Sequence, residues 1–258
     1  MKIDAVTTFN DKGLAQYGIN MLRSFYERWA FETTLHVYTE GWYPYQLSEH
    51  GVDPDWPQFR FYDLNIASKW LVPFKLRHAG LSTMPGFRHD VVRFSHKVAA
   101  LCEAARNSDA DYLIWLDADV FLHQDFCIEN LQPFLPQGNE WIAWLDRTRA
   151  YPECGFYILN LKHPLHELNL AAFENMYTQD LFLQEKEYHD SYLLMRVVQT
   201  RNIVAKSLSG KGKMSHHPLV NGPLGKYFDH LKGRRKEVGR SLASDLVFRR
   251  DEPYWRKK

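Results

Sequence analysis

Residues 111–123 read DYLIWLDADVFLH, and this stretch decides the fold class. Tyr112–Leu116 is a short apolar run of strand-favouring residues, typical of a central strand in a parallel sheet. Asp117 and Asp119 follow it, and a second apolar run, Val120–Leu122, comes next. Ligands of parallel sheets bind beyond the carboxyl ends of the strands, so the pair is predicted at a ligand-binding edge. Two carboxylates on one side of an extended backbone can share a divalent cation. A simple turn, which aspartate favours, is the alternative explanation.

Alternating strand and helix patterns surround this stretch. Apolar residues recur at helical spacing over 14–29 and 90–106. Further strands are predicted at 2–9, 33–39, 58–62, 141–145 and 156–161, and further helices at 169–177 and 191–198. This rhythm predicts an α/β fold with a mostly parallel sheet flanked by helices. Residues 64–90 show no clear period and are predicted to form a long binding loop or lid.

Charge divides the chain into two unequal parts. The 258 residues carry a net charge of +1 and are 45% hydrophobic, which suits a globular α/β domain with or without an appendage. Residues 206–258 hold 14 Lys/Arg against 5 Asp/Glu. We therefore expect a main domain at 1–205 and a basic carboxy-terminal segment at 206–258. Such a segment suits phosphate, nucleic acid or an anionic membrane surface, and a solvated tail is the alternative.

The sequence also bears on the compartment. The amino terminus lacks the apolar stretch of a secretory signal, and no run approaches the ~20 apolar residues of a membrane span. Three cysteines without metal-ligand spacing suit a reducing compartment. We expect a cytoplasmic protein, with peripheral contact to the inner face of the membrane as an extension of that expectation.

A family resemblance rests on the opening stretch. YLIWLDADVFL resembles the DxD segment of the GT-A glycosyltransferases, and residues 1–205 follow the order of segments in that family. The resemblance implies a GT-A (Rossmann-like) fold and a nucleotide-sugar donor, with a UDP-sugar preferred. It also implies that Asp117 and Asp119 hold Mn²⁺ or Mg²⁺ against the donor diphosphate, with Asp117 contacting the donor complex.

Two segments are predicted to bind the donor. VTTFND (6–11) ends the first strand, where GT-A enzymes place the base and ribose, so Thr8 and Asn10 are candidates for those contacts. Capping of the following helix is the alternative for Asn10. VVRFSHKV (91–98) resembles the segment before the DxD strand in retaining families related to glycogenin and bacterial galactosyltransferases. That resemblance implies a donor contact from Arg93, with Lys97 one helical turn later.

Two further segments supply candidate catalytic carboxylates. YPECGFYILNL (151–161) resembles the acceptor-side strand of the same families, where a glycine lets the sugar approach the backbone. Gly155 matches it, and Glu153 is the nearby carboxylate. EYHDSYLL (187–194) resembles the segment beneath the anomeric carbon, which implies a role for Asp190 as nucleophile, base or sugar ligand. Ser191 stands where the family has a second acidic residue, so these roles stay open.

The segment SHHPLVNGPLGKYF (215–228) is the last constellation. In glycogenin-like families a late histidine, followed by glycine, proline and lysine, closes the site. By resemblance His217, or His216 beside it, is the metal ligand and Lys226 the diphosphate partner. A lysine suits phosphate as a point charge.

Together these motifs predict a metal-dependent glycosyltransferase that moves a sugar onto a hydroxyl acceptor, with retention by analogy. A saccharide or lipid-linked acceptor is one expectation. The alternative is a nucleic acid, such as a hydroxylated base in phage-type DNA modification. A nucleotidyltransferase and a non-catalytic nucleotide-binding domain are further alternatives.

Overall fold

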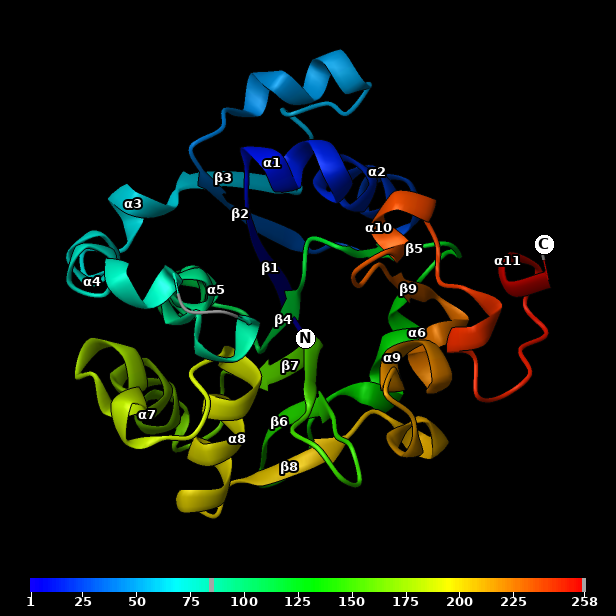
Figure 1. Ribbon diagram of the computed structural model, residues 1–258. Coiled ribbons are helices and arrows are strands. Elements are labelled where there is room, and N and C mark those ends of the chain that lie inside the picture. Colours follow the sequence, from blue (N-terminus) through cyan, green and yellow to red (C-terminus); the bar gives the residue numbers. More distant parts are fainter. Residues whose placement is uncertain (84–85, 257–258) are drawn as a thin grey trace.

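A seven-stranded sheet forms the centre of the computed structural model, which describes residues 1–83 and 86–256 (Figure 1). The strand order is β3-β2-β1-β4-β7-β6-β8. The strands are β1 (Ile3–Asn10), β2 (Thr34–Glu40), β3 (Phe59–Asp63), β4 (Tyr112–Leu116), β6 (Glu140–Leu145), β7 (Glu153–Asn160) and β8 (Val204–Ser207). β3, β2, β1 and β4 pair in parallel, β7 runs antiparallel to both its neighbours, and β8 is parallel to β6. The predicted α/β class, with a mostly parallel sheet flanked by helices, is confirmed.

Helices cover both faces of the sheet. The longest are α2 (Ile19–Arg28), α5 (Val91–Asn107), α7 (His166–Thr178) and α8 (Asp190–Thr200). α5, α7 and α8 pack on one face over a buried apolar cluster that includes Trp115 and Tyr157. α2 and the carboxy-terminal elements pack on the other face, around a cluster that includes Phe25 and Phe156. Burial on both faces explains why the central strands read as continuous apolar runs.

The predicted helices and strands are all present, with shifts of one to three residues at their ends. The interval 64–90 differs from its prediction, because it contains α3 (Leu64–Ala67), α4 (Leu71–Arg77) and short 3-10 turns. Leu71 and Phe74 lie one turn apart and are both fully buried against α5 and the neighbouring helices. Tertiary packing therefore orders a segment whose own pattern is weak. Residues 84–85 of that interval lie outside the described residues.

The carboxy-terminal segment returns to the core. β9 (Phe228–His230) pairs antiparallel with β5 (Val120–Leu122) to form a two-stranded sheet. The short helix α9 (Pro218–Asn221) precedes β9 in the chain, and α10 (Arg235–Val238) and α11 (Pro253–Arg256) follow it (Figure 1). Trp255 is 9% exposed, and its Nε1 donates a hydrogen bond to the Gly225 carbonyl at 2.8 Å. The position proposed as a domain boundary, residue 205, falls inside β8. Across the described part of the chain, no helix combines the length and the apolar character needed to cross a bilayer.

Candidate active site

The two aspartates lie in a tight turn at the carboxyl end of β4. The Asp117 amide donates to the Gly155 carbonyl of β7 at 2.9 Å, and the Val120 amide donates to the Asp117 carbonyl at 2.9 Å. The chain therefore leaves the main sheet at Asp117 and enters β5 three residues later. This geometry fixes Asp117 and Asp119 at the edge where parallel strands present ligands.

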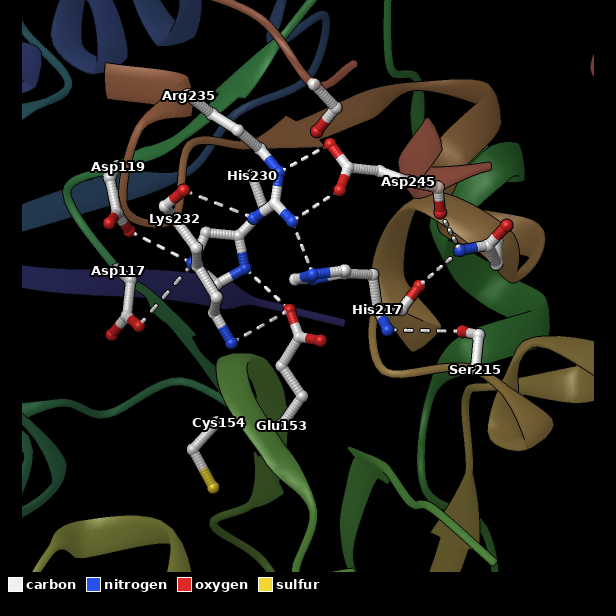
Figure 2. A network of polar contacts seen from close by, with 12 residues as sticks. Asp117, Asp119, Glu153, Cys154, Ser215, His217, His230, Lys232, Arg235 and Asp245 are labelled. Atoms are coloured by element: carbon white, nitrogen blue, oxygen red, sulfur yellow. Dashed lines mark hydrogen bonds and ion pairs between the residues drawn. The ribbon is translucent and has the colours of Figure 1, made fainter. Parts of the chain in front are cut away.

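Strand pairing brings a histidine to this turn. In the β5–β9 ladder Val120 lies opposite His230, and the Leu231 amide donates to the Asp119 carbonyl at 2.8 Å. His230 is 1% exposed. Its Nε2 lies 3.0 Å from Asp119 Oδ1 and 4.0 Å from Asp117 Oδ2 (Figure 2). The ligating atoms of the three side chains all lie within 4.8 Å of one another.

These three side chains fit a divalent cation. The buried Nε2 of His230 makes no hydrogen bond of acceptable geometry with any described residue, although it points at two carboxylates. Two carboxylate oxygens and one imidazole nitrogen form a mixed donor set that divalent metals accept. Burial opposes charge on Asp119, but His230 and Lys236 hold the pKa of that carboxyl well below its ordinary value. An ionised carboxylate is the form that binds a metal.

Glu153 supports the histidine from behind. It begins β7, is 1% exposed, and its Oε1 accepts a hydrogen bond from His230 Nδ1 at 2.6 Å. The predicted catalytic role of Glu153 therefore needs correction, since this buried carboxylate faces His230 rather than an open substrate site. A carboxylate on the second ring nitrogen fixes the tautomer and orientation of a metal-ligating histidine.

Gly155 explains how His230 fits. A Cβ on Gly155 would clash with the His230 ring and lie 2.8 Å from its Nδ1. The absence of a side chain at this position was expected to admit a sugar. In the structure it admits the imidazole.

Two lysines from α10 and the turn before it cover the carboxylates. Lys236 Nζ lies 2.9 Å from Asp119 Oδ2 and 4.1 Å from the centre of the Tyr17 ring. Lys232 Nζ lies 3.4 Å from Glu153 Oε1 (Figure 2). Both side chains are partly exposed, so they can shift to an anionic ligand at the mouth of the site.

Lys97 connects the DxD turn to Asp190. Its Nζ lies 2.8 Å from Asp117 Oδ1 and 2.8 Å from Asp190 Oδ2. Burial opposes the charge, but Asp117 and Asp190 together raise the pKa of Lys97 above its ordinary value. Asp190 is 4% exposed and begins α8. Lys97 therefore joins Asp190 to Asp117 through one shared cation, and the substrate role of Asp190 stays a prediction.

His217 occupies a different network. Its Nε2 contacts Arg235, whose guanidinium binds both oxygens of Asp245 at 2.6 and 2.7 Å (Figure 2). Burial lowers the pKa of His217 to about 4, with Arg235 acting in the same direction. The metal assignment of His217 therefore needs correction, because the structure brings His230 to the aspartates instead. His216 is exposed, and among the described residues it does not belong to the group formed by Asp117, Asp119 and His230.

The predicted nucleoside contacts lie at the ends of β1 and β2. Thr8 Oγ1 lies 2.8 Å from the Tyr38 carbonyl and 2.8 Å from Glu40 Oε1. Glu40 Oε2 lies 2.6 Å from His96 Nδ1, and the buried Nε2 of His96 has no hydrogen-bond partner among the described residues. Asn10 Oδ1 accepts from the Gly13 amide at 2.8 Å, which is the helix-capping alternative. The ends of β1 and β2 thus carry several polar side chains, and the nucleoside contacts of Thr8 and Asn10 stay predictions.

Arg93 lies in the first turn of α5. Its side chain is exposed, above Phe94 on α5. Burial raises the pKa of Tyr17 to about 12, Asp119 and Asp117 act in the same direction, and Arg93 acts against them. A donor contact from Arg93 stays a prediction.

Lys226 lies elsewhere. It is exposed at the end of the turn Pro223–Lys226, with Nζ 5.2 Å from the Tyr227 ring centre. No ion pair joins it to a carboxylate within the described ranges. Lys232 and Lys236 occupy the position beside the carboxylates that Lys226 was expected to fill.

His230 and Lys236, which lie beside the aspartates, were missed, although their signal was present in the sequence. The order histidine, glycine, lysine that pointed to 217, 222 and 226 occurs again at His230, Gly233 and Lys236, with shorter spacing and without the proline. Lys97 was noted only as a neighbour of Arg93. Its position on the buried face of α5 depends on two carboxylates supplied by other elements.

Known proteins resemble this chain in part. Residues 87–200 match the model of the family described as Glycosyl transferase family 2, which is less than half of the chain. No curated protein matches the chain.

Solved structures share its fold. Mouse xyloside xylosyltransferase 1 superposes with a TM-score of 0.52 at 16% identity, over 81% of this chain and 86% of that one. The bifunctional glycosyltransferase WbbM superposes with a TM-score of 0.51 at 13% identity, over 81% of this chain and 39% of that one. These structural neighbours confirm the predicted GT-A fold, and the family match supports a glycosyltransferase.

Proposed function

We propose that the protein is a divalent-metal-dependent glycosyltransferase that moves a sugar from a nucleoside diphosphate donor, a UDP-sugar above others, to a hydroxyl acceptor. One observation carries this proposal: the β5–β9 pairing places His230 against Asp117 and Asp119 at the carboxyl edge of the sheet. The family match and the fold support the reaction class. No finding on the described residues favours a nucleic-acid acceptor, a nucleotidyltransferase or a non-catalytic domain.

Different residues bind the metal, the diphosphate and the nucleoside of the donor. Asp117, Asp119 and His230 hold a Mn²⁺ or Mg²⁺ ion, which when bound neutralises charge on the diphosphate leaving group. Lys236 and Lys232 leave their carboxylates and bind the diphosphate oxygens as point charges. Thr8 and Asn10, at the end of β1, and Arg93, on α5, contact the nucleoside portion. Glu153 keeps Nε2 of His230 directed at the aspartates.

Asp190 acts at the sugar. Transfer proceeds through a transition state with positive charge on the anomeric carbon and ring oxygen, which a nearby carboxylate stabilises. Lys97 holds one oxygen of Asp190, leaving the other for the sugar. Retention of anomeric configuration is part of the proposal and rests on the resemblance of residues 151–161 and 187–194 to retaining families.

A donor panel tests the proposal. The protein is incubated with UDP-, GDP- and CMP-sugars with and without Mn²⁺, and release of the nucleotide is followed by chromatography. We expect slow hydrolysis of one donor that requires the metal and disappears in Asp119→Ala. Absence of hydrolysis and of metal-dependent nucleotide binding with every donor would overturn the proposal. Proton NMR of the transferred product, which distinguishes the anomers, decides between retention and inversion.

A further inference from the structure

The edge of the sheet where β6 and β8 end carries a surface that the donor site does not use. β6 and β8 run parallel to each other, and β6 and β4 are each antiparallel to β7, so all three end at one edge. The loop 146–152 follows β6 and the segment 208–214 follows β8. The Thr148 amide donates to the Lys213 carbonyl at 3.0 Å, which joins the two. We call them together the acceptor rim.

The acceptor rim is strongly basic. It contains Arg147, Arg149, Lys211 and Lys213, and Asp146 is its one acidic residue. Within the described residues none of these four cations forms an ion pair, and Asp146 is hydrogen-bonded to Ser207. No carboxylate of the described residues therefore pairs with these cations. Clustered like charges of this kind lower stability unless an anion binds them.

Arg147 shows most clearly that a partner is missing. Its Nε is buried and has no hydrogen-bond partner among the described residues, and its guanidinium lies 5.4 Å from the Tyr151 ring centre. A guanidinium stacked on an aromatic ring keeps its planar set of donors free for a carboxylate or phosphate. An unpaired buried donor costs free energy, which a bound oxyanion recovers.

A hollow adjoins these charges. It has a volume of about 560 Å³ and is lined by Ser207, Gly210, Lys211, Lys213, Met214 and Phe248. Met214 is 67% and Phe248 37% exposed. Apolar side chains beside fixed cations suit a sugar ring that carries an anionic group.

The rim also connects to the reacting end of the site. The Tyr151 ring lies 4.5 Å from the ring of His189, centre to centre, and His189 directly precedes Asp190. Arg147, Tyr151 and His189 thus form a continuous line of contacts from the basic rim to the carboxylate assigned to the sugar. A ligand in the hollow would approach Asp190 from the side opposite to the nucleoside contacts of β1 and β2.

We infer that the acceptor is an anionic glycan, whose phosphate or carboxylate group binds Arg147, Arg149, Lys211 and Lys213. This inference rests on the proposed transferase function and specifies the substrate class of the same site. Phosphate and carboxylate share the oxyanion chemistry that the rim recognises, so the experiment contains both.

Matched sugar probes test it. Binding is measured by ligand-observed NMR with the donor half saturated by Mg²⁺ and UDP, which keeps the probes from the diphosphate site. The phosphate pair is mannose 6-phosphate against mannose, and the carboxylate pair is methyl glucuronide against methyl glucoside. We expect at least one anionic member to bind about tenfold or more tighter than its neutral partner, with a preference that shrinks at high salt.

Two double variants test whether the rim cations cause the preference for the anionic probe. Arg147→Gln/Arg149→Gln and Lys211→Gln/Lys213→Gln should each lose most of it. Lys162→Gln, which removes an exposed charge beyond the carboxyl end of the antiparallel strand β7, at the other edge of the sheet, should keep it. Thermal melting confirms that each variant is folded. Equal affinity for the charged and neutral members, no binding by any probe, or a preference unchanged in both double variants would overturn the inference.

The donor panel separates the two proposals. Donor hydrolysis by the unmodified protein together with no anion preference would overturn the acceptor class and leave the proposed function standing. Absence of hydrolysis with every donor would overturn both, because an acceptor requires a transferase.

Discussion

At the residue scale, the two ring nitrogens of His230 have different partners. Nδ1 bonds to Glu153 at 2.6 Å, whereas Nε2 points at Asp119 and Asp117 without a good hydrogen bond. The imidazole is thus oriented by one carboxylate and directed at two others. Burial opposes charge on Glu153, but Lys232 and His230 hold its pKa below the ordinary value, so it stays an acceptor. These features make His230 the best test of the metal site.

Replacing His230 with alanine should weaken Mn²⁺ binding by about 100-fold or more, because one of three ligands is lost. His217→Ala is the matched control and should leave the affinity within a few-fold, since His217 contacts Arg235 instead. Mn²⁺ titration followed by electron paramagnetic resonance measures both. The reverse order of the two variants would return the ligand role to His217.

Glu153→Gln should reduce Mn²⁺ affinity by about tenfold, because a neutral amide orients the imidazole less strongly and lowers its basicity. Glu187→Gln is the control, since Glu187 makes the same type of contact at 2.8 Å to a different histidine, His189. The same titration applies. Equal effects of the two substitutions would mean that Glu153 has no special relation to the metal site.

At the element scale, the short strand β9 carries His230, the proposed metal ligand, and is held by the chain beyond it. Asp229, fully buried in β9, accepts hydrogen bonds from the Ser241 amide at 2.7 Å and from the Tyr254 hydroxyl at 2.6 Å. The Ser241 hydroxyl and the His230 amide complete its contacts, at 2.5 and 2.6 Å. One carboxylate therefore ties residues 241–254 to the strand that positions His230.

Asp229→Ala should lower the free energy of unfolding by about 3 kcal/mol, because several buried donors lose their acceptor. It should also weaken Mn²⁺ binding, since β9 loses its anchor. Tyr254→Phe removes a single donor and should cost about 1 kcal/mol. Urea unfolding of the two variants provides the comparison. An Asp229→Ala loss no larger than that of Tyr254→Phe would show that the carboxylate does not anchor the strand.

At the scale of the whole molecule, the carboxy-terminal residues pack in the same apolar core as the first strands. His123, just after β5, contacts these residues: its ring stacks on Tyr254 with the ring centres 4.0 Å apart, and its Nε2 lies 3.3 Å from the Gly225 carbonyl. Burial lowers the pKa of His123 to about 4 from an ordinary value of 6.5. The folded protein therefore favours the neutral ring, whereas the unfolded chain takes up a proton near pH 6.5.

The His123 contribution to stability is complete above pH 6.5 and is lost as the pH falls towards 4, because the unfolded state then binds more protons. Between pH 7 and pH 5 this group alone should cost about 2 kcal/mol. His123→Phe keeps an aromatic ring and should remove that part of the pH dependence. His216→Gln, at an exposed position, is the control and should keep it. Urea unfolding at both pH values measures the slope, and an unchanged slope in His123→Phe would refute the assignment.

Local patterns were enough to predict most elements of the sheet. Alternation of apolar strands and amphipathic helices predicted α5, β4 and the α/β class, because side-chain periodicity depends only on neighbours in the chain. The pattern failed in 64–90, where α4 owes its order to Leu71 and Phe74 packing on distant helices. Charge composition set residues 206–258 apart as a basic segment, and the structure shows that apolar side chains of this segment pack in the main core. Charge composition averages over such residues and hides them.

The sequence by itself determined where the two aspartates lie, because they directly follow a strand whose apolar run is unmistakable. Only the tertiary structure decided which side chains join them. His230 reaches Asp119 through the register of the β5–β9 ladder, and a slip of one residue would turn it to the opposite face. Lys97 is buried because Asp117 and Asp190, from different elements, both neutralise it. Such contacts depend on pairing and packing across the chain, which no local pattern encodes.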